Sequence, residues 1–379
     1  MKKFNRVMYI LMIMNIYFLL PTVYTYKVEA TSGEPSVLAH AYVVMDANSG
    51  SIIYSQDGNK KIYPASTVKM MTALVAVEQG NLSDKITVKE SVLSNVSKDA
   101  TTIGLKAGTT YTLEELLNML LIYSASDAAD TIADAIAGSV SQYIKLMNER
   151  AKSLGMNSTS FDNTMGLDIG NKYYNTYSTA KDIAKLTKYV MNNKIIRNIV
   201  GKSSYTITKF NNGSSKTINN TNQLLRDKRY QNDSYKIIGT KTGTTNAAGY
   251  ALSATAIDNK GREIICTFFG NGTISQMYEN IDELLTYTYK NLSTNYEFKE
   301  VDNSINYGWK QIDNKWYYYD KSGKIKKGWI SENGKWYYLT NTIIHGLDID
   351  YHFIIYLCFI VILFIIDVYL LILVKKKYN

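Results

Sequence analysis

Hydrophobic and polar positions follow two different periods along the chain, and these periods predict where strands and helices lie. Apolar runs and alternating stretches, which are typical of strands, occur at 40–46, 51–54, 203–221, 237–240, 250–257 and 263–269. Apolar residues at helical spacing occur at 64–79, 112–121, 126–137, 140–153, 178–191 and 274–289. Strands at both ends with helices between them predict an α/β fold of the α+β type, in which an antiparallel sheet is flanked by helices and a helical subdomain.

Local signals predict where several helices begin and end. Pro64 suits a first helical turn, because its φ is already fixed and its missing N–H is not needed there. Gly80 is a natural stop for the same helix. Thr112 and Glu115 have the spacing of a capping box, and Ser178 is predicted to be the N-cap of the helix that follows it.

The first 30 residues have the pattern of a secretory signal peptide. Lys2, Lys3 and Arg6 form a basic start, residues 7–20 are apolar apart from one asparagine, and small residues precede position 31. The alternative is an uncleaved membrane anchor. Both interpretations predict that the body of the protein is exported and extracytoplasmic, with residues 31–37 as a short linker.

A second apolar stretch, residues 353–374, is long enough to cross a membrane once. Lys375, Lys376 and Lys377 follow it, and this basic flank predicts a transmembrane helix with its C-terminus in the cytoplasm. Asp367 disagrees with this interpretation, because a carboxyl group in the middle of a span costs about 3 kcal/mol. The alternative is a buried or artefactual tail.

Residues 307–342 contain an aromatic repeat, preceded by a linker at 293–306. Gly-Trp at 308–309 recurs at 328–329, and Trp-Tyr-Tyr at 316–318 recurs at 336–338, so the offset is 20 residues. This period predicts two short β-hairpin repeats. Aromatic faces can bind a glycan or a cationic ligand, and the alternative is plain packing between hairpins. The candidate wall-binding residues are Trp309, Trp316, Tyr317, Trp329, Trp336 and Tyr337.

Composition and charge narrow the classes of function. The net charge of +9 is spread over both termini and lysine-rich turns, and no basic stripe predicts a nucleic-acid partner. Three histidines and two cysteines leave little material for a metal site, so we expect neither a metal nor another cofactor.

Ser66 and Lys69 are candidate catalytic residues on chemical grounds. They lie three residues apart at a predicted helix start, so their side chains share one face of the helix. A serine beside a lysine that loses its proton on burial is a plausible activated nucleophile. Ser178 and Lys181 have the same spacing, but the predicted capping role explains Ser178.

Several ordered motifs resemble the serine D-alanyl-D-alanine carboxypeptidases, the low-molecular-mass penicillin-binding proteins. They are DANSG at 46–50, PASTVKMMTAL at 64–74, LIYSASDAA at 121–129 and GTKTGT at 239–244. Residues 161–167, 178–186 and 220–222 also resemble the family pattern. The resemblance covers 38–292 and implies a β-lactamase/transpeptidase-like fold that binds penicillin. The repeats resemble cell-wall-binding modules of the choline-binding type, and two units leave choline, another polymer or a partner chain open as the ligand.

The resemblance also implies roles for residues. Ser66 would attack the penultimate D-Ala carbonyl of a peptidoglycan stem peptide, Lys69 would take its proton, and Ser124 would pass a proton to the leaving D-Ala. Lys241 would lower the pKa of Lys69 and attract the substrate carboxylate. The N–H groups of Ser66 and Thr244 would form an oxyanion hole. β-Lactams would acylate Ser66. The implied substrate-binding residues are Lys241, Thr242, Gly243, Thr244 and Ser126.

Ser126 departs from the family pattern, which has asparagine at this position. An amide both donates and accepts hydrogen bonds, whereas a serine hydroxyl is shorter and reaches less far. Slower acylation or lost activity would follow. One alternative is therefore a non-catalytic cell-wall or penicillin-binding protein. A serine β-lactamase is another, and EELLN at 114–118 spells a motif of its deacylating base, but it precedes the second motif instead of following it.

Overall fold

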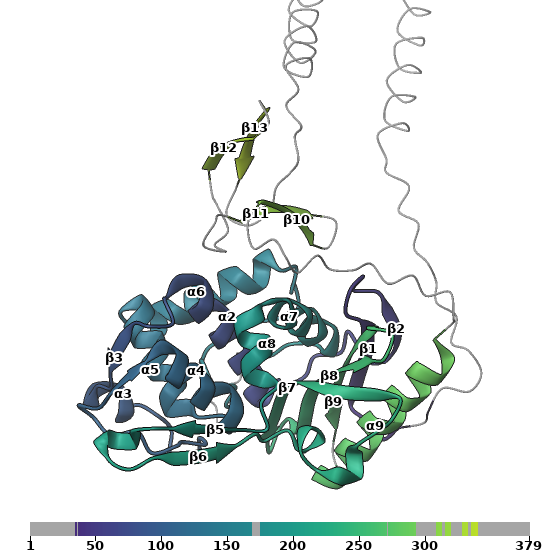
Figure 1. Cartoon of the computed structure of the whole chain (residues 1–379), viewed down its shortest axis with the longest axis horizontal. Coiled ribbons are helices and arrows are strands. Elements are labelled where there is room, and N and C mark those ends of the chain that lie inside the picture. Colours follow the sequence, from purple (N-terminus) through teal and green to yellow (C-terminus); the bar gives the residue numbers. More distant parts are fainter. Residues whose placement is uncertain are drawn as a thin grey trace, which may run out of the picture. The chain divides into compact units, whose positions relative to one another are not determined.

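The computed structural model of the chain describes residues 35, 37–168, 175–270 and 272–292, together with four short strands between 308 and 339. Five strands form an antiparallel sheet in the order β2-β1-β9-β8-β7 (Figure 1). Their bounds are β1 Ala41–Asp46, β2 Ile52–Gln56, β7 Tyr235–Thr245, β8 Gly249–Asp258 and β9 Glu263–Gly270. The predicted antiparallel sheet is confirmed, but β7 continues past the predicted end at residue 240 and contains the whole Lys-Thr-Gly motif.

The sheet is buried on both faces. Val43 and Met45 of β1 belong to one hydrophobic core, and Tyr42 and Val44 belong to another. This division follows from the pleat, because successive side chains of a strand point to opposite faces. The helix α7 (Ala180–Asn192) packs on the first face and α9 (Ile274–Asn291) on the second, which makes three layers (Figure 1).

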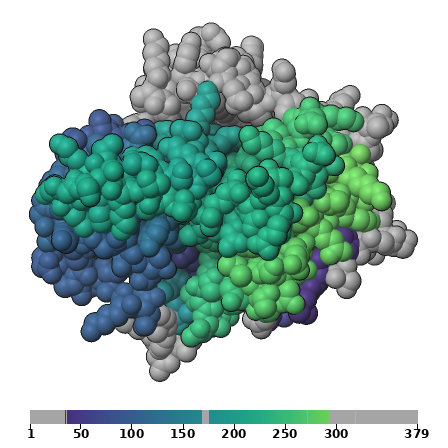
Figure 2. All heavy atoms as spheres, turned by 60° about the horizontal axis from the view of Figure 1, so that its bottom comes forward, coloured from purple at the N-terminus to yellow at the C-terminus, as the bar shows by residue number. Residues whose placement is uncertain are grey.

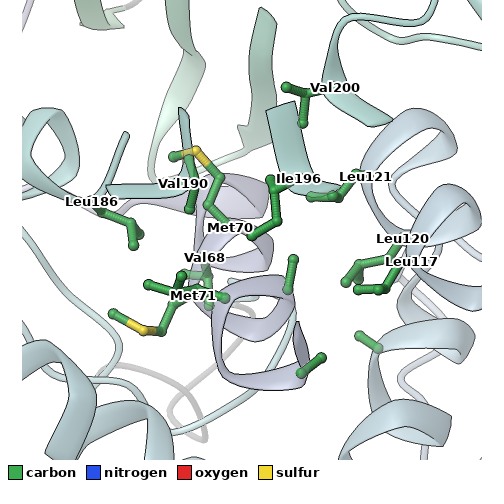
Figure 3. Close-up of a cluster of buried hydrophobic side chains, with 14 of the residues drawn as sticks. Val68, Met70, Met71, Leu117, Leu120, Leu121, Leu186, Val190, Ile196 and Val200 are labelled. Carbon is green, nitrogen blue, oxygen red and sulfur yellow. The ribbon is translucent and has the colours of Figure 1, made fainter. Parts of the chain in front are cut away.

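The helix α2 (Lys69–Gln79) lies at the centre of the larger core. All of its residues from Lys69 to Ala76 are buried. Figure 3 shows Met70 and Met71 of this helix among side chains of other helices, including Leu117, Leu120, Leu186 and Val190. A helix that is buried on every side is held by packing and not by its own propensity. The residue at its start, Lys69, is therefore fixed by the core.

The remaining elements form the helical block beside the sheet and its connections. Figure 2 shows residues 85–153 of this group in blue and residues 194–230 in teal. Their bounds are η1 Ala65–Val68, β3 Lys85–Thr87, α3 Glu90–Leu93, β4 Thr110–Thr112, α4 Leu113–Asn118, the π-helix η2 Met119–Tyr123, α5 Ser126–Ala137, α6 Val140–Ser153, α8 Lys194–Val200, β5 Ser204–Ile207, η4 Phe210–Asn212, β6 Lys216–Asn219, η5 Gln223–Leu225 and η6 Lys228–Tyr230.

The predicted helix boundaries are confirmed in most places and wrong at one cap. The capping box forms, with Glu115 N donating to Thr112 Oγ1 and Thr112 N donating to Glu115 Oε2. Ser178 is not the N-cap of α7. Thr179 takes that role, because its Oγ1 accepts from Asp182 N at 3.1 Å, while the backbone of Ser178 pairs with that of Ile62.

Two separate hairpins occur in the repeat region, as the 20-residue period predicts. One pairs β10 (Gly308–Ile312) with β11 (Lys315–Tyr319), and the other pairs β12 (Gly328–Glu332) with β13 (Lys335–Leu339). Their registers are equivalent, with residue 309 opposite 318 and residue 329 opposite 338. The six candidate aromatic residues thus occupy corresponding strand positions in the two units.

Several predicted segments lie outside the described residues. They are the signal peptide at 1–30, the linker at 293–306 and the transmembrane helix at 353–374. Among the helices that the structure does describe, none has the length and apolarity needed to cross a membrane.

Candidate active site

Ser66 and Lys69 meet at the junction of η1 and α2. The helical turn begins directly after Pro64, as predicted, and Thr67 Oγ1 donates to the Pro64 carbonyl at 2.6 Å. Lys69 Nζ donates to Ser66 Oγ at 2.9 Å. Ser66 is half-buried, whereas Lys69 is only 1% exposed. The pair therefore joins a hydroxyl that a substrate can reach to an amine held in the core.

Burial favours the neutral form of the Lys69 amine. It lowers the pKa of Lys69 to about 7, although the carboxylates of Asp130 and Asp127 raise it. Lys241 is also buried, and its pKa lies well below the usual value because of burial and the charge of Lys69. Burial is thus the main cause of the lowered pKa of Lys69, and the expected effect of Lys241 on that pKa stays a prediction.

Two glycines hold the backbone on either side of Ser66. Ala65 has a positive φ of 47°, which is uncommon for a residue with a Cβ. A Cβ on Gly166 would lie 1.8 Å from the Ala65 carbonyl oxygen, and one on Gly243 would lie 2.9 Å from Ser66 N. Only glycine fits this close at either position. The Ala65–Ser66 peptide is therefore clamped between a loop and the strand β7.

The Lys-Thr-Gly segment lies within β7, at the edge of the sheet and against η1. Lys241 and Gly243 are buried, Thr242 is half-buried and Thr244 is exposed. Lys241 Nζ donates to the Thr242 carbonyl at 3.0 Å, and the hydroxyl groups of Thr242 and Thr221 share a hydrogen bond of 2.6 Å. A cation and several hydroxyl groups thus line the strand beside Ser66, which suits a carboxylate ligand.

Ser124 and Ser126 both lie just after the short π-helix η2. Ser124 has a left-handed backbone with φ of 69°, and Ser126 is the first residue of α5. Both residues are buried, yet neither hydroxyl makes a hydrogen bond to another described residue. Thr221 N donates to the Ile122 carbonyl at 3.1 Å, so this turn is tied to the residue that bonds Thr242. The second motif therefore borders the same site.

Sequence reasoning missed two residues beside Lys69. Asp130 is buried on α5 and accepts a hydrogen bond from Thr164 Oγ1 at 2.5 Å. Lys69 Nζ also donates to the carbonyl of Met165 at 3.3 Å. A charged residue three positions after Asp127, on an alanine-rich helix, is a signal that could have identified Asp130. No sequence pattern predicts the contact between Lys69 Nζ and the Met165 carbonyl.

The competing motifs have structural explanations. Ser178 Oγ shares a hydrogen bond of 2.8 Å with Thr159 Oγ1 and makes none with Lys181. Glu114, which would be the base of the second string, is exposed on the capped helix α4. The side chain of Asn118 donates to the Glu114 carbonyl and accepts from Lys202 Nζ. Within the described part of the chain, neither string joins the Ser66 site.

The antiparallel sheet with its flanking helices places this chain in the penicillin-binding/transpeptidase-like class of folds. Within that class, the chain belongs to the D-alanyl-D-alanine carboxypeptidase family, whose sequence pattern matches residues 28–272. The pattern of the choline-binding repeat matches residues 307–342.

Known proteins support the same assignment. D-alanyl-D-alanine carboxypeptidase DacA of Haemophilus influenzae is 30% identical over 266 residues, which are 69% of this chain and 64% of that protein. The chain thus spans less than two thirds of that relative's length. Penicillin binding protein 5 of H. influenzae has a TM-score of 0.61 at 28% identity, covering 69% of this chain and 73% of its own. A point mutant of the Streptomyces K15 DD-transpeptidase gives a TM-score of 0.61 at 29% identity, covering 68% of this chain and 100% of its own.

Proposed function

We propose that this chain is a serine D-alanyl-D-alanine carboxypeptidase that removes the terminal D-Ala from peptidoglycan stem pentapeptides. The proposal rests on one observation above all. Lys69 Nζ lies 2.9 Å from Ser66 Oγ, and burial brings the pKa of this amine to about 7. A neutral amine at hydrogen-bond distance can accept the proton of the attacking hydroxyl near neutral pH. β-Lactams, which present a reactive amide in the same place, would acylate Ser66 as inhibitors.

The reaction would proceed through an ester on Ser66. Ser66 Oγ attacks the carbonyl carbon of the penultimate D-Ala while Lys69 takes the hydroxyl proton. The N–H groups of Ser66 and Thr244 stabilise the oxyanion, at about 3 kcal/mol for each donor. The C–N bond then breaks, and Ser124 passes a proton to the departing D-Ala amine. Water attacks the ester, which releases the shortened peptide as a carboxylate and restores the Ser66 hydroxyl.

Residues of β7 and α5 would bind the substrate. Lys241 and the hydroxyl groups of Thr242 and Thr244 suit the terminal carboxylate, and Gly243 lets the strand approach Ser66 closely. Ser126 would hold the substrate amide in place of the asparagine of the family pattern. A protonated Lys241 is favoured once the carboxylate binds, because an opposite charge offsets its burial.

The test is D-Ala release from a synthetic peptide that ends in D-Ala-D-Ala. We expect release by the wild-type chain and none by Ser66→Ala. Ser178→Ala is the matched control, because it removes the serine of the other Ser-x-x-Lys match and should leave release unchanged. A folded wild-type chain that releases no D-Ala would contradict the proposal. If that chain instead hydrolysed penicillin rapidly, it would be a β-lactamase, and if it only stayed acylated, it would be a penicillin-binding protein without this activity.

We also propose how the enzyme is placed at the cell wall. Residues 38–292 would form the catalytic domain, the linker 293–306 would follow, and the two repeats at 307–342 would bind a wall polymer with a choline-like group. The match to the choline-binding repeat supports this ligand class. The chain should bind a choline-coated resin, and free choline should release it. A chain that does not bind this resin would exclude choline as the ligand of the repeats.

The export and anchoring signals support an extracytoplasmic location. The sequence patterns at 1–30 and 353–374 would direct export and then hold the chain in the membrane, with its C-terminus in the cytoplasm. Protease treatment of intact cells should degrade the catalytic domain and leave an epitope tag at the C-terminus intact. Degradation of the tag would refute the proposed orientation.

A further inference from the structure

Asp130 is a buried carboxyl group that the proposed mechanism does not use. It lies on α5, one turn after Asp127, and is 5% exposed. Its Oδ1 accepts a hydrogen bond of 2.5 Å from Thr164 Oγ1. Burial raises the pKa of Asp130 to about 6, while this hydrogen bond and the charge of Lys69 lower it. A carboxyl group in a core destabilises the fold unless it is compensated, so its position requires an explanation.

Thr164 connects Asp130 to the amine of Lys69 through the backbone. The Thr164 carbonyl accepts from Thr72 Oγ1 at 2.6 Å, and the next carbonyl, that of Met165, accepts from Lys69 Nζ at 3.3 Å. Lys69 and Thr72 are three residues apart, so one face of α2 contacts both carbonyls. Holding Thr164 therefore holds the Met165 carbonyl in front of Lys69.

The rest of this segment is fixed from the other end. Asn163 Oδ1 accepts hydrogen bonds from the N–H groups of Met165, Gly166 and Leu167, at 3.1, 2.6 and 3.1 Å. Gly166 in turn packs against the carbonyl of Ala65. Residues 163–167 thus touch both the base and the backbone of the nucleophile, and Asp130 is the side chain on α5 that ties them down.

Charge gives Asp130 a second influence on Lys69. The charged groups around Lys69 are Asp127 and Asp130 from α5 and Lys241 from β7. The Asp127 carboxylate holds a neighbouring loop, because it accepts hydrogen bonds from the N–H groups of residues 103, 104 and 105. Among the described residues, Asp130 has only Thr164 as a hydrogen-bond partner. Its negative charge favours the protonated form of Lys69.

We propose that Asp130 is a positioning residue for Lys69: through Thr164 it holds the Met165 carbonyl against the amine, and its charge sets the pH range in which Lys69 accepts the proton of Ser66. This role rests on the proposed function, because it concerns acylation of Ser66. The pKa of Lys69 is then set by two opposing effects. The Asp130 carboxylate opposes deprotonation of Lys69, and burial in the core favours it.

The test measures the rate of acylation by benzylpenicillin from about pH 5 to about pH 9. Asp130→Asn keeps an oxygen that accepts from Thr164 but removes the charge. We expect the acidic limb of the profile to move by about one unit to lower pH. Thr164→Val keeps the charge and removes the hydrogen bond, and it should lower the plateau rate about tenfold. Asp134→Asn, on the same helix but paired with Lys89, is the matched control and should change neither.

The inference would be overturned if the acidic limb of the acylation profile stayed in place in Asp130→Asn while the melting temperature was preserved. Loss of a carboxyl group with a purely structural role would not shift this limb. The failure of the proposed function is distinguishable. If penicillin acylates the wild-type chain but the chain releases no D-Ala from peptide, the carboxypeptidase activity is refuted. The pH profiles of acylation in the wild type and the variants can still be compared. A wild-type chain that penicillin does not acylate would refute both.

Discussion

Gly166 is the position at which a single methyl group should damage the site most. In Gly166→Ala the new Cβ would lie 1.8 Å from the Ala65 carbonyl oxygen and 2.3 Å from its carbon. Real Cβ contacts begin at about 3.0 Å, so the 163–167 segment and the Ala65–Ser66 peptide must separate by about 1.2 Å. The φ of Gly166, +85°, adds the strain of a left-handed alanine.

The expected loss follows from that displacement. Moving a reacting group by about 1 Å can reduce a rate about 100-fold, or about 2.7 kcal/mol of transition-state stabilisation. Stability should fall by about 3 kcal/mol, because overpacking and backbone strain add. The assay is the second-order rate of acylation by a fluorescent penicillin, with urea unfolding of the same preparation.

Gly138→Ala is the control that separates the backbone strain of a left-handed alanine from the steric clash expected in Gly166→Ala. Gly138 has a similar φ of +77° at the C-cap of α5, but a Cβ there would meet nothing within 4 Å. It should lose about 1 to 2 kcal/mol of stability and keep the wild-type acylation rate. If Gly166→Ala were acylated as fast as wild type and lost no more stability than Gly138→Ala, the proposed clamp on Ser66 would be wrong.

Four further outcomes follow from the geometry. Acylation of the wild-type chain should fall about tenfold for each pH unit below about 7, because Lys69 must be neutral to accept a proton; a flat profile down to pH 5 would contradict this role. Ser126→Asn should speed acylation, since an amide both donates and accepts, and a slower stopped-flow rate would refute the reasoning. Met71→Ala should cost about 3 kcal/mol in urea unfolding, as its side chain is fully buried. Thr112→Ala should cost about 1 kcal/mol through the lost cap and leave acylation unchanged, so a lower acylation rate would count against a purely local role.

Much of the fold could be predicted, because it depends on local patterns. The continuous apolar run in β1 and the apolar spacing in α2 each reflect burial that one segment reveals by itself. The cap of α7 shows the limit of this reasoning. Ser178 and Thr179 are both good N-caps, and the choice between them depends on the pairing of Ser178 with Ile62, which is distant in sequence.

The pairing of Ser66 with Lys69 was predictable, but the surroundings of the pair were not. Spacing places Ser66 and Lys69 on one helix face, and the structure brings their side chains together. The depth of Lys69 in the core, which lowers its pKa, depends on packing from several helices. The alanine-rich pattern of α5 could have marked Asp130 as unusual, but its place near Lys69 depends on the packing of α5 against α2, which no local pattern encodes.

The pairing of β1 with β9 has a consequence for the order in which the protein can fold. Thr267 Oγ1 donates to the carbonyl of Val43, across a sequence separation of 224 residues. Closing so long a loop is slow, and β1 remains an open edge until β9 has been synthesised. A chain that crosses a membrane unfolded would therefore complete the sheet beside Ser66 only after residue 270 has emerged. Fragments that end before Glu263 should aggregate through the exposed edge of β1.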